Sequence, residues 1–143
     1  MLWAGLIFFL STDSFSAEHT GSILYAVLHW FKPSLTEEQI EPLHYFIRKS
    51  AHFTEYFVFC VLLFRGARGC RAGWRWTWAL GALSLAAGYS ALDEIHQAFV
   101  ASRTASPWDS LLDSAGAFAA SIALYVWFRC RTPKLDANDL GRN

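Results

Sequence analysis

Three apolar segments of this chain carry their ionisable side chains at one end only, and this pattern constrains the fold more than any other feature. Trp76–Leu92 is uncharged over seventeen residues and runs directly into two carboxylates. Ser114–Phe128 is uncharged over fifteen residues and follows two aspartates, while Ala51–Phe64 has its polar groups near its start. Extended through its polar turns, each segment has about 20 residues and is about 30 Å long as a helix, the hydrocarbon thickness of a bilayer. We therefore expect three membrane-spanning helices over residues 47–66, 76–98 and 108–128.

The composition supports a membrane protein over a small soluble domain. Of the 143 residues, 54% are hydrophobic and only 17% are charged, against roughly 25% charged in soluble domains. A chain this short has too little polar surface to cover such an apolar core. The formal net charge is zero, so there is no basic field to hold a polyanion, and we expect no nucleic-acid partner. The three cysteines lack CxxC spacing and are expected to be free thiols.

Basic residues set the expected orientation. They are concentrated in the link between the first two helices and after the third, whereas the remaining link has only Arg103. The residues in the two basic groups are Arg65, Arg68, Arg71 and Arg75, and Arg129, Arg131 and Lys134. Because positively charged links stay on the cytoplasmic side, we expect the C-terminus inside the cell. Residues 1–131 would form one transmembrane domain, and 132–143 a polar cytoplasmic tail.

The N-terminal third is expected to contribute shorter helices. Leu2–Leu10 would span only about 15 Å as a helix, which fits the outer half of a truncated first span. The predicted fold is therefore an all-α bundle of four transmembrane helices whose first member is partial. Apolar residues recur at helical spacing over 23–31, as in an amphipathic helix on the outer leaflet, with packing on the bundle as the alternative. Thr36 and Gln39 resemble a capping box that opens a short helix able to accommodate Pro42 in its first turns.

The polar ends of the three long helices are expected to lie at one depth. Side chains that share or flank a face are His52, Glu55 and Tyr56 on the first helix, Asp93, Glu94 and Gln97 on the second, and Asp109 and Asp113 on the third. A carboxylate in hydrocarbon costs a few kcal/mol, so these groups should face one another or a water-filled hollow. The small-residue patterns Ser84xxxGly88 and Gly116xxxAla120 would let the helices approach closely.

The same residues carry a resemblance to a known family. They are RKSAHFTEY at Arg48–Tyr56, DEIHQAFVASR at Asp93–Arg103, then Asp109, Asp113 and Gly116, with IFFLS at Ile7–Ser11. Over residues 3–128 the chain resembles the VanZ-like family of bacterial membrane proteins. The resemblance implies a protein of the bacterial cytoplasmic membrane, associated with teicoplanin resistance, and it carries no established biochemical activity. The chain departs from the family pattern at Ala101 and Ser102, where Pro-Gly is frequent, at Ala120, where glycine is common, and in lacking most of the first helix.

One hypothesis for the polar residues is an enzyme acting on a membrane-anchored envelope substrate. The candidate catalytic residues are His52, Glu55, Asp93, Glu94 and Asp113, because a histidine among carboxylates can supply a general acid and base. The candidate substrate-binding residues are Lys49, Tyr56, Gln97, Arg103 and Asp109, with the two cations gripping a phosphate or carboxylate of a headgroup. A divalent ion held by the histidine and three carboxylates, with a position open to water, is a second form of this hypothesis.

The other hypothesis is an accessory or scaffold protein without chemistry. The polar groups would then be charge pairs, such as Glu55 with Lys49 or Asp93 with Arg103, that hold the helices in register. They could also form a pocket for a glycopeptide, a lipid-linked precursor or a partner subunit. The acids and histidines outnumber the nearby cations, which weighs against purely structural pairing.

Overall fold

Residues 2–10, 12, 17–99 and 106–131 are described by the structure, a computed structural model, and they form five helices and no strand. The helices are α1 (Leu2–Leu10), α2 (Ala17–Phe31), α3 (Glu37–Arg68), α4 (Trp76–Gln97) and α5 (Pro107–Arg131). The all-helical fold expected from the sequence is therefore confirmed over these ranges. The expected tail, 132–143, lies outside the described residues.

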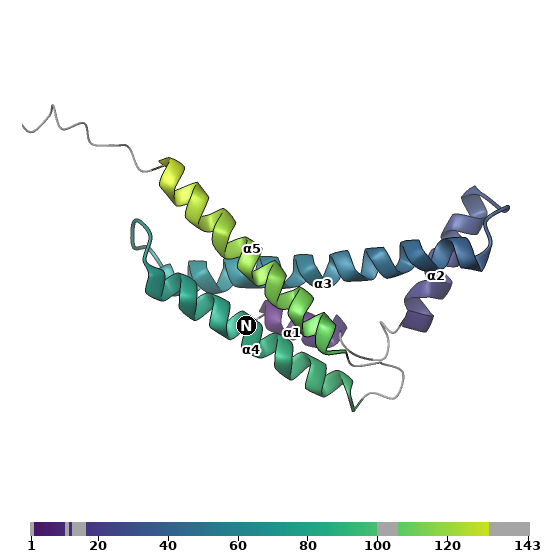
Figure 1. The fold of residues 1–143 in the computed structure, drawn as a ribbon, viewed down its shortest axis with the longest axis horizontal. Helices are drawn as coiled ribbons and strands as arrows, with labels where there is room; N and C mark the ends of the chain where they lie inside the picture. The colour runs from purple at the N-terminus through teal and green to yellow at the C-terminus, as the bar shows by residue number, and fades with distance from the viewer. Residues whose placement is uncertain (1, 11, 13–16, 100–105, 132–143) are drawn as a thin grey trace, which may run out of the picture.

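The core is a bundle in which α3, α4 and α5 each pack against the other two. Its buried apolar side chains come mainly from these three helices, with Tyr56, Phe64 and Ala86 among the most enclosed. In Figure 1, α5 crosses α3, and the first turns of α3 extend beyond the bundle together with α2. The end of α3, the start of α4 and the end of α5 lie together on the left, so the arginines near these three helix termini share one end of the bundle.

The helix bounds agree with the sequence for α4 and α5 and differ for α3. The expected short helix after Thr36 and the expected helix over 47–66 are one continuous helix of 32 residues. Its capping box is present, with the backbone N–H of Thr36 donating to Gln39 Oε1 at 3.3 Å. The prediction of two helices was wrong because Pro42 removes only one hydrogen bond near the start, and no helix-breaking residue follows it before the apolar segment.

Small residues allow close packing, but on α4 they are not the ones expected. Ser84 and Gly88 are exposed, and a Cβ built on Gly88 meets nothing within 4 Å. The buried stripe is instead Ala82, Ala86 and Ser90, spaced four residues apart. On α5 the expectation is confirmed, because Gly116 and Ala120 are both buried. A Cβ on Gly116 would lie 2.3 Å from the carbonyl oxygen of Phe53, so α3 and α5 touch backbone to backbone there.

The short helix α1 packs along the half of the bundle that holds the polar groups. Trp3 Nε1 donates to the carbonyl of Glu55 at 3.1 Å, and the Tyr89 hydroxyl donates to the carbonyl of Ala4 at 2.8 Å. Further along, the ring of Phe8 lies 4.7 Å from that of His96. These contacts place α1 beside the polar half of the bundle.

The helix α2 packs on the N-terminal turns of α3. Thr20 Oγ1 lies 3.0 Å from His44 Nε2, and the missing Cβ of Gly21 leaves room for the same imidazole. Burial, and then the positive charge of Arg48, lower the pKa of His44. Ile23 is 66% exposed and Val27 is 48% exposed, so part of the apolar face of α2 is not covered by the described residues.

By length and composition, α5 is the one helix among the described residues that is able to cross a membrane. Only 22% of its most apolar eighteen-residue window is buried, so most of this apolar surface faces outward. Four transmembrane helices are not shown by this criterion. Asp93 and Glu94 near the end of α4, and the ionisable residues of α3, lower the hydropathy of those helices.

The contact between Gly116 and Phe53 gives the first prediction. Gly116→Ala should lower the free energy of unfolding by about 1–3 kcal/mol, because the new methyl group meets a backbone oxygen that cannot rotate away. Gly88→Ala is the matched control and should be neutral or slightly stabilising, because its site is open. Denaturant unfolding in detergent micelles, followed by circular dichroism, measures both. Equal stability of the two variants would contradict the close approach of α3 and α5.

Candidate functional site

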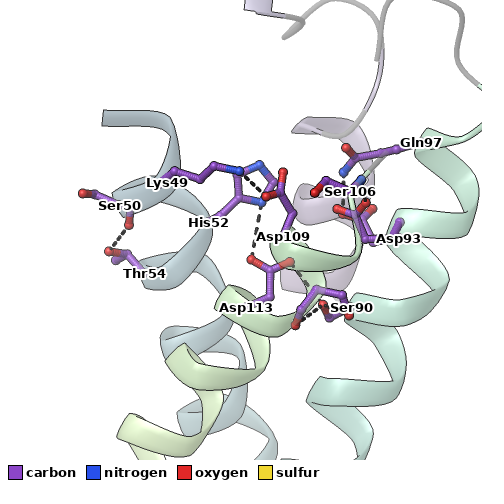
Figure 2. Close-up of polar contacts among 12 residues, drawn as sticks. Lys49, Ser50, His52, Thr54, Ser90, Asp93, Gln97, Ser106, Asp109 and Asp113 are labelled. Atoms are coloured by element: carbon purple, nitrogen blue, oxygen red, sulfur yellow. Dashed lines mark hydrogen bonds and ion pairs between the residues drawn. The ribbon is translucent and has the colours of Figure 1, made fainter. Parts of the chain in front are cut away.

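A polar cluster joins the three core helices at one level (Figure 2). His52 of α3 places Nδ1 at 3.5 Å from Asp113 Oδ1 of α5, a charge contact too long for a strong hydrogen bond. The other carboxylate oxygen, Asp113 Oδ2, accepts from Ser90 Oγ of α4 at 3.2 Å. Only 1% of the Asp113 side chain is exposed, against 14% for His52. Asp113 is therefore the enclosed centre of the cluster, and His52 lies toward its open side.

A second contact, between Lys49 of α3 and Asp109 of α5, lies about one turn closer to the N-terminus of both helices. The ammonium of Lys49 also lies 5.2 Å from the centre of the Tyr45 ring. Side chains of this pair are 25% and 16% exposed. The pair therefore forms a partly solvated rim above the His52–Asp113 contact, as Figure 2 shows.

The end of α4 adds two further acidic side chains to the cluster. Asp93 Oδ2 accepts from Gln97 Nε2 at 3.0 Å, within one turn of the helix. Glu94 Oε2 accepts from the backbone N–H of Ser106 at 2.8 Å. Ser106 immediately precedes α5, so this carboxylate lies at the positive end of the helix dipole. Glu94 thereby fixes the start of α5 against the end of α4.

Four buried polar atoms of the cluster have no hydrogen-bond partner within the described part of the chain. They are His52 Nδ1, Tyr56 Oη, Glu94 Oε1 and Asp113 Oδ1. Buried polar groups are nearly always hydrogen-bonded in native structures. His52 Nδ1 and Asp113 Oδ1 face each other at 3.5 Å, so the atoms of this cluster left for water or for a polar ligand are mainly Tyr56 Oη and Glu94 Oε1.

The remaining predicted residues are distributed around this centre. Glu55 is half-buried, and its charge acts on His52, whereas Lys49 pairs with Asp109 instead of Glu55. Tyr56 is fully buried, at the base of the cluster. Arg103 lies outside the described residues. The structure thus brings together the predicted side chains of all three helices, while their roles stay predictions.

Sequence reasoning missed three serines. Ser90 Oγ lies 3.0 Å from Ser110 Oγ and 3.3 Å from the Ser110 carbonyl, in addition to Asp113. Ser106 holds Glu94 through its backbone. A signal for Ser90 was available, because it lies three residues before Asp93 and therefore on the same face of α4.

Chemically, the cluster contains the parts of an acid–base site. An imidazole next to a buried carboxylate is oriented by it and can accept or donate a proton at its other nitrogen. Ser90 is fully enclosed, so its hydroxyl supports Asp113 and is not placed to attack a substrate. No three His, Cys, Asp or Glu side chains of the described chain are arranged to hold a metal ion.

Comparison with known proteins gives one match. A family model described as VanZ/LLP1 matches residues 1–129, which is nearly the whole chain. No curated protein matches, and no solved structure matches.

The contacts of Ser90 generate the second prediction. Ser90→Ala should lower the free energy of unfolding by about 1–2 kcal/mol, because Asp113 Oδ2 loses its donor inside the bundle. The double variant with Asp113→Asn should deviate from additivity, since the two side chains share one contact. Ser84→Ala on the exposed face of α4 is the matched control, with an expected change within about 0.5 kcal/mol. Unfolding in detergent micelles is measured for the parent, the two single variants, the double variant and the control, and strict additivity would contradict the bridge.

Proposed function

Because the chain belongs to the VanZ/LLP1 family, a family of membrane proteins associated with teicoplanin resistance, we propose that it acts at the bacterial cell envelope. It is a multi-pass protein of the cytoplasmic membrane with its C-terminus in the cytoplasm. The polar cluster faces outward and binds or processes a lipid headgroup or an envelope precursor. A lipid-linked precursor and a glycopeptide are the two candidate ligands.

The distribution of charge supports this orientation. The acidic residues whose side chains the structure describes lie at positions 37–55, 93–94 and 109–113, toward one end of the bundle. The other end carries arginines that pack on aromatic rings, such as Arg75 at 5.4 Å from Trp78 and Arg131 at 3.9 Å from Trp127. Arginines with interfacial tryptophans are typical of the cytoplasmic membrane boundary.

The packing of the core supports several spans although α5 alone has the required hydropathy. The acids that lower the hydropathy of α4, Asp93 and Glu94, are buried against the other helices. Large apolar side chains of the same helix, Leu80, Leu85 and Leu92, are about 60% exposed. A helix with its carboxylates inside and its leucines outside fits lipid surroundings better than water. We therefore assign α4, α5, the second part of α3 and the short α1 to the membrane.

The unpartnered buried atoms of the cluster carry the functional proposal. Glu94 Oε1 is an acceptor and the Tyr56 hydroxyl is both donor and acceptor, while Asp113 Oδ1 has only its long contact with His52. Hydroxyl, amide and amine groups of sugars and peptides are complementary to such carboxylate oxygens. Lys49, at the open rim, adds a cation for a phosphate or carboxylate.

A structural charge network is the second candidate, and specific contacts favour it. Lys49 with Asp109, Gln97 with Asp93, and the Ser106 amide with Glu94 satisfy much of the cluster internally. In that case the cluster would hold the helices in register without acting on a ligand.

The third prediction separates these functions. In a host whose teicoplanin tolerance depends on this chain, His52→Ala should abolish the tolerance while the protein still folds and inserts. His52 lies on the open side of the cluster, where water can take its place beside Asp113, and the Ser90–Asp113 bridge remains, so we expect enough folded protein to measure tolerance. Tolerance is measured as the minimal inhibitory concentration, normalised to the amount of folded protein in the membrane fraction.

His96→Ala is the matched control, because this imidazole packs against Phe8 away from the cluster and should leave tolerance unchanged. Adding Asp113→Asn to His52→Ala should cause no further loss of tolerance. A tolerance that falls only in proportion to folded protein would establish the structural network and refute the ligand site.

The fourth prediction tests the orientation. A green fluorescent protein fused in the link between α3 and α4, near Cys70, should fluoresce, and an alkaline phosphatase fused at the same point should be inactive. The same pair fused between α4 and α5 should give the opposite result, because Gln97 and Ser106, which flank that link, belong to the polar cluster. Active phosphatase at the arginine-rich link would refute the outward placement of the cluster.

A further inference from the structure

A groove between α3 and α5 opens at the arginine end of the bundle, far from the polar cluster. Its volume is about 390 Å³. Phe57, Val61 and Leu124 contribute to its apolar lining, and Arg65 and Arg68 lie at one end of it. The polarity of the groove therefore changes along its length from apolar to cationic.

The length of the groove matches one leaflet of a bilayer. From Phe57 to Arg68 the α3 axis rises by about 16 Å, close to half of the roughly 30 Å hydrocarbon thickness. The apolar part points toward the bilayer centre, and the arginines reach the level of the headgroups. An acyl chain lying along Val61 and Leu124 would bring its headgroup to the arginines.

The two arginines are available to an anion. The guanidinium of Arg68 lies 5.3 Å from the centre of the Phe128 ring, which holds it at the wall of the groove. Arg65 is exposed. Neither forms an ion pair with a carboxylate of the described residues, because both such pairs belong to the polar cluster. A phosphate between them would accept charge-assisted hydrogen bonds, which are stronger than neutral ones.

We propose that this groove binds an anionic phospholipid of the cytoplasmic leaflet, with one acyl chain between α3 and α5 and the phosphate at Arg65 and Arg68. Basic pockets between transmembrane helices on the cytoplasmic side recognise such headgroups. A net negative headgroup is required, because the ammonium group of a zwitterionic lipid would bring its own positive charge toward the arginines. The proposal rests on the membrane orientation proposed above and is independent of what the polar cluster binds.

The fifth prediction is a binding experiment on the full chain in neutral detergent. Native mass spectrometry with phosphatidylglycerol, phosphatidylcholine of the same acyl chains, and inorganic phosphate should show preferred binding of phosphatidylglycerol. The double variant R65Q/R68Q should weaken this binding by about tenfold, because each arginine contributes separately to phosphate attraction. Arg71→Gln is the matched control and should leave binding unchanged, because Arg71 packs toward Trp78 outside the groove.

A second pair of variants tests the apolar part without changing charge. Ala123 lines the groove, so Ala123→Phe should fill it and weaken phosphatidylglycerol binding. Ala91→Phe, on an exposed face of α4, should not. Elution volume in size-exclusion chromatography verifies that each variant is folded.

Three results would overturn the lipid site: a folded R65Q/R68Q protein that binds phosphatidylglycerol like the parent, equal binding of phosphatidylcholine, or equally tight binding of inorganic phosphate. None of these results bears on teicoplanin tolerance, so the failure of the lipid site and of the polar cluster would be distinguishable. A reversed orientation in the fusion assay would overturn the leaflet named here as well as the proposed function.

Discussion

The burial of Asp113 is the constraint on which the rest of this structure depends. A carboxylate that is 1% exposed inside an apolar bundle requires compensation from whatever surrounds it. Here His52 and Ser90 supply it from the two other core helices. Because one side chain has partners on both neighbours, the axial position of α5 is fixed relative to α3 and α4 together. Apolar packing alone would not specify that register, since sliding one helix past another exchanges one apolar contact for a similar one.

This polar bridge works only because the backbones approach closely. Gly116 lies one turn beyond Asp113 and lets α5 touch the carbonyl of Phe53, next to His52 in α3. On α4, Ala86 lies one turn before Ser90 and is fully buried. Small residues therefore stand beside each polar contact, which brings a short serine side chain within reach of the carboxylate. Close packing and polar bridging therefore depend on each other, because the small residues bring the polar side chains into contact and these contacts fix where the helices touch.

The sequence predicts the polar end of the bundle well because one physical rule governs it. Acids at three- and four-residue spacing on long apolar helices must converge, and His52, Asp93 and Asp113 do so. The packing face of α4 was predicted wrongly from Ser84 and Gly88, because this helix carries small residues on several faces and their spacing alone does not choose among them. The position of Asp93 indicates the correct packing face, because Ala82, Ala86 and Ser90 lie on the same side of α4 as Asp93. The length of α3 was missed because the capping box at Thr36 was interpreted as the start of a separate short helix, whereas the backbone continues without a break into the apolar segment.

The two ends of the bundle differ in how their charges are compensated, and this difference is the basis of the two separate ligands proposed for them. At the polar end, carboxylates meet protein donors, and only a few atoms in the interior remain for a ligand. At the other end, arginines pack on aromatic rings and have no carboxylate among the described residues. A ring compensates a cation only in part, so these arginines keep their attraction for anions from outside the chain. In the proposed orientation, anionic lipids of the cytoplasmic leaflet would complete the charge balance of that end. The interior of the chain completes most of the balance at the polar end, so the proposed ligand would meet only the few atoms that the described protein leaves unpartnered.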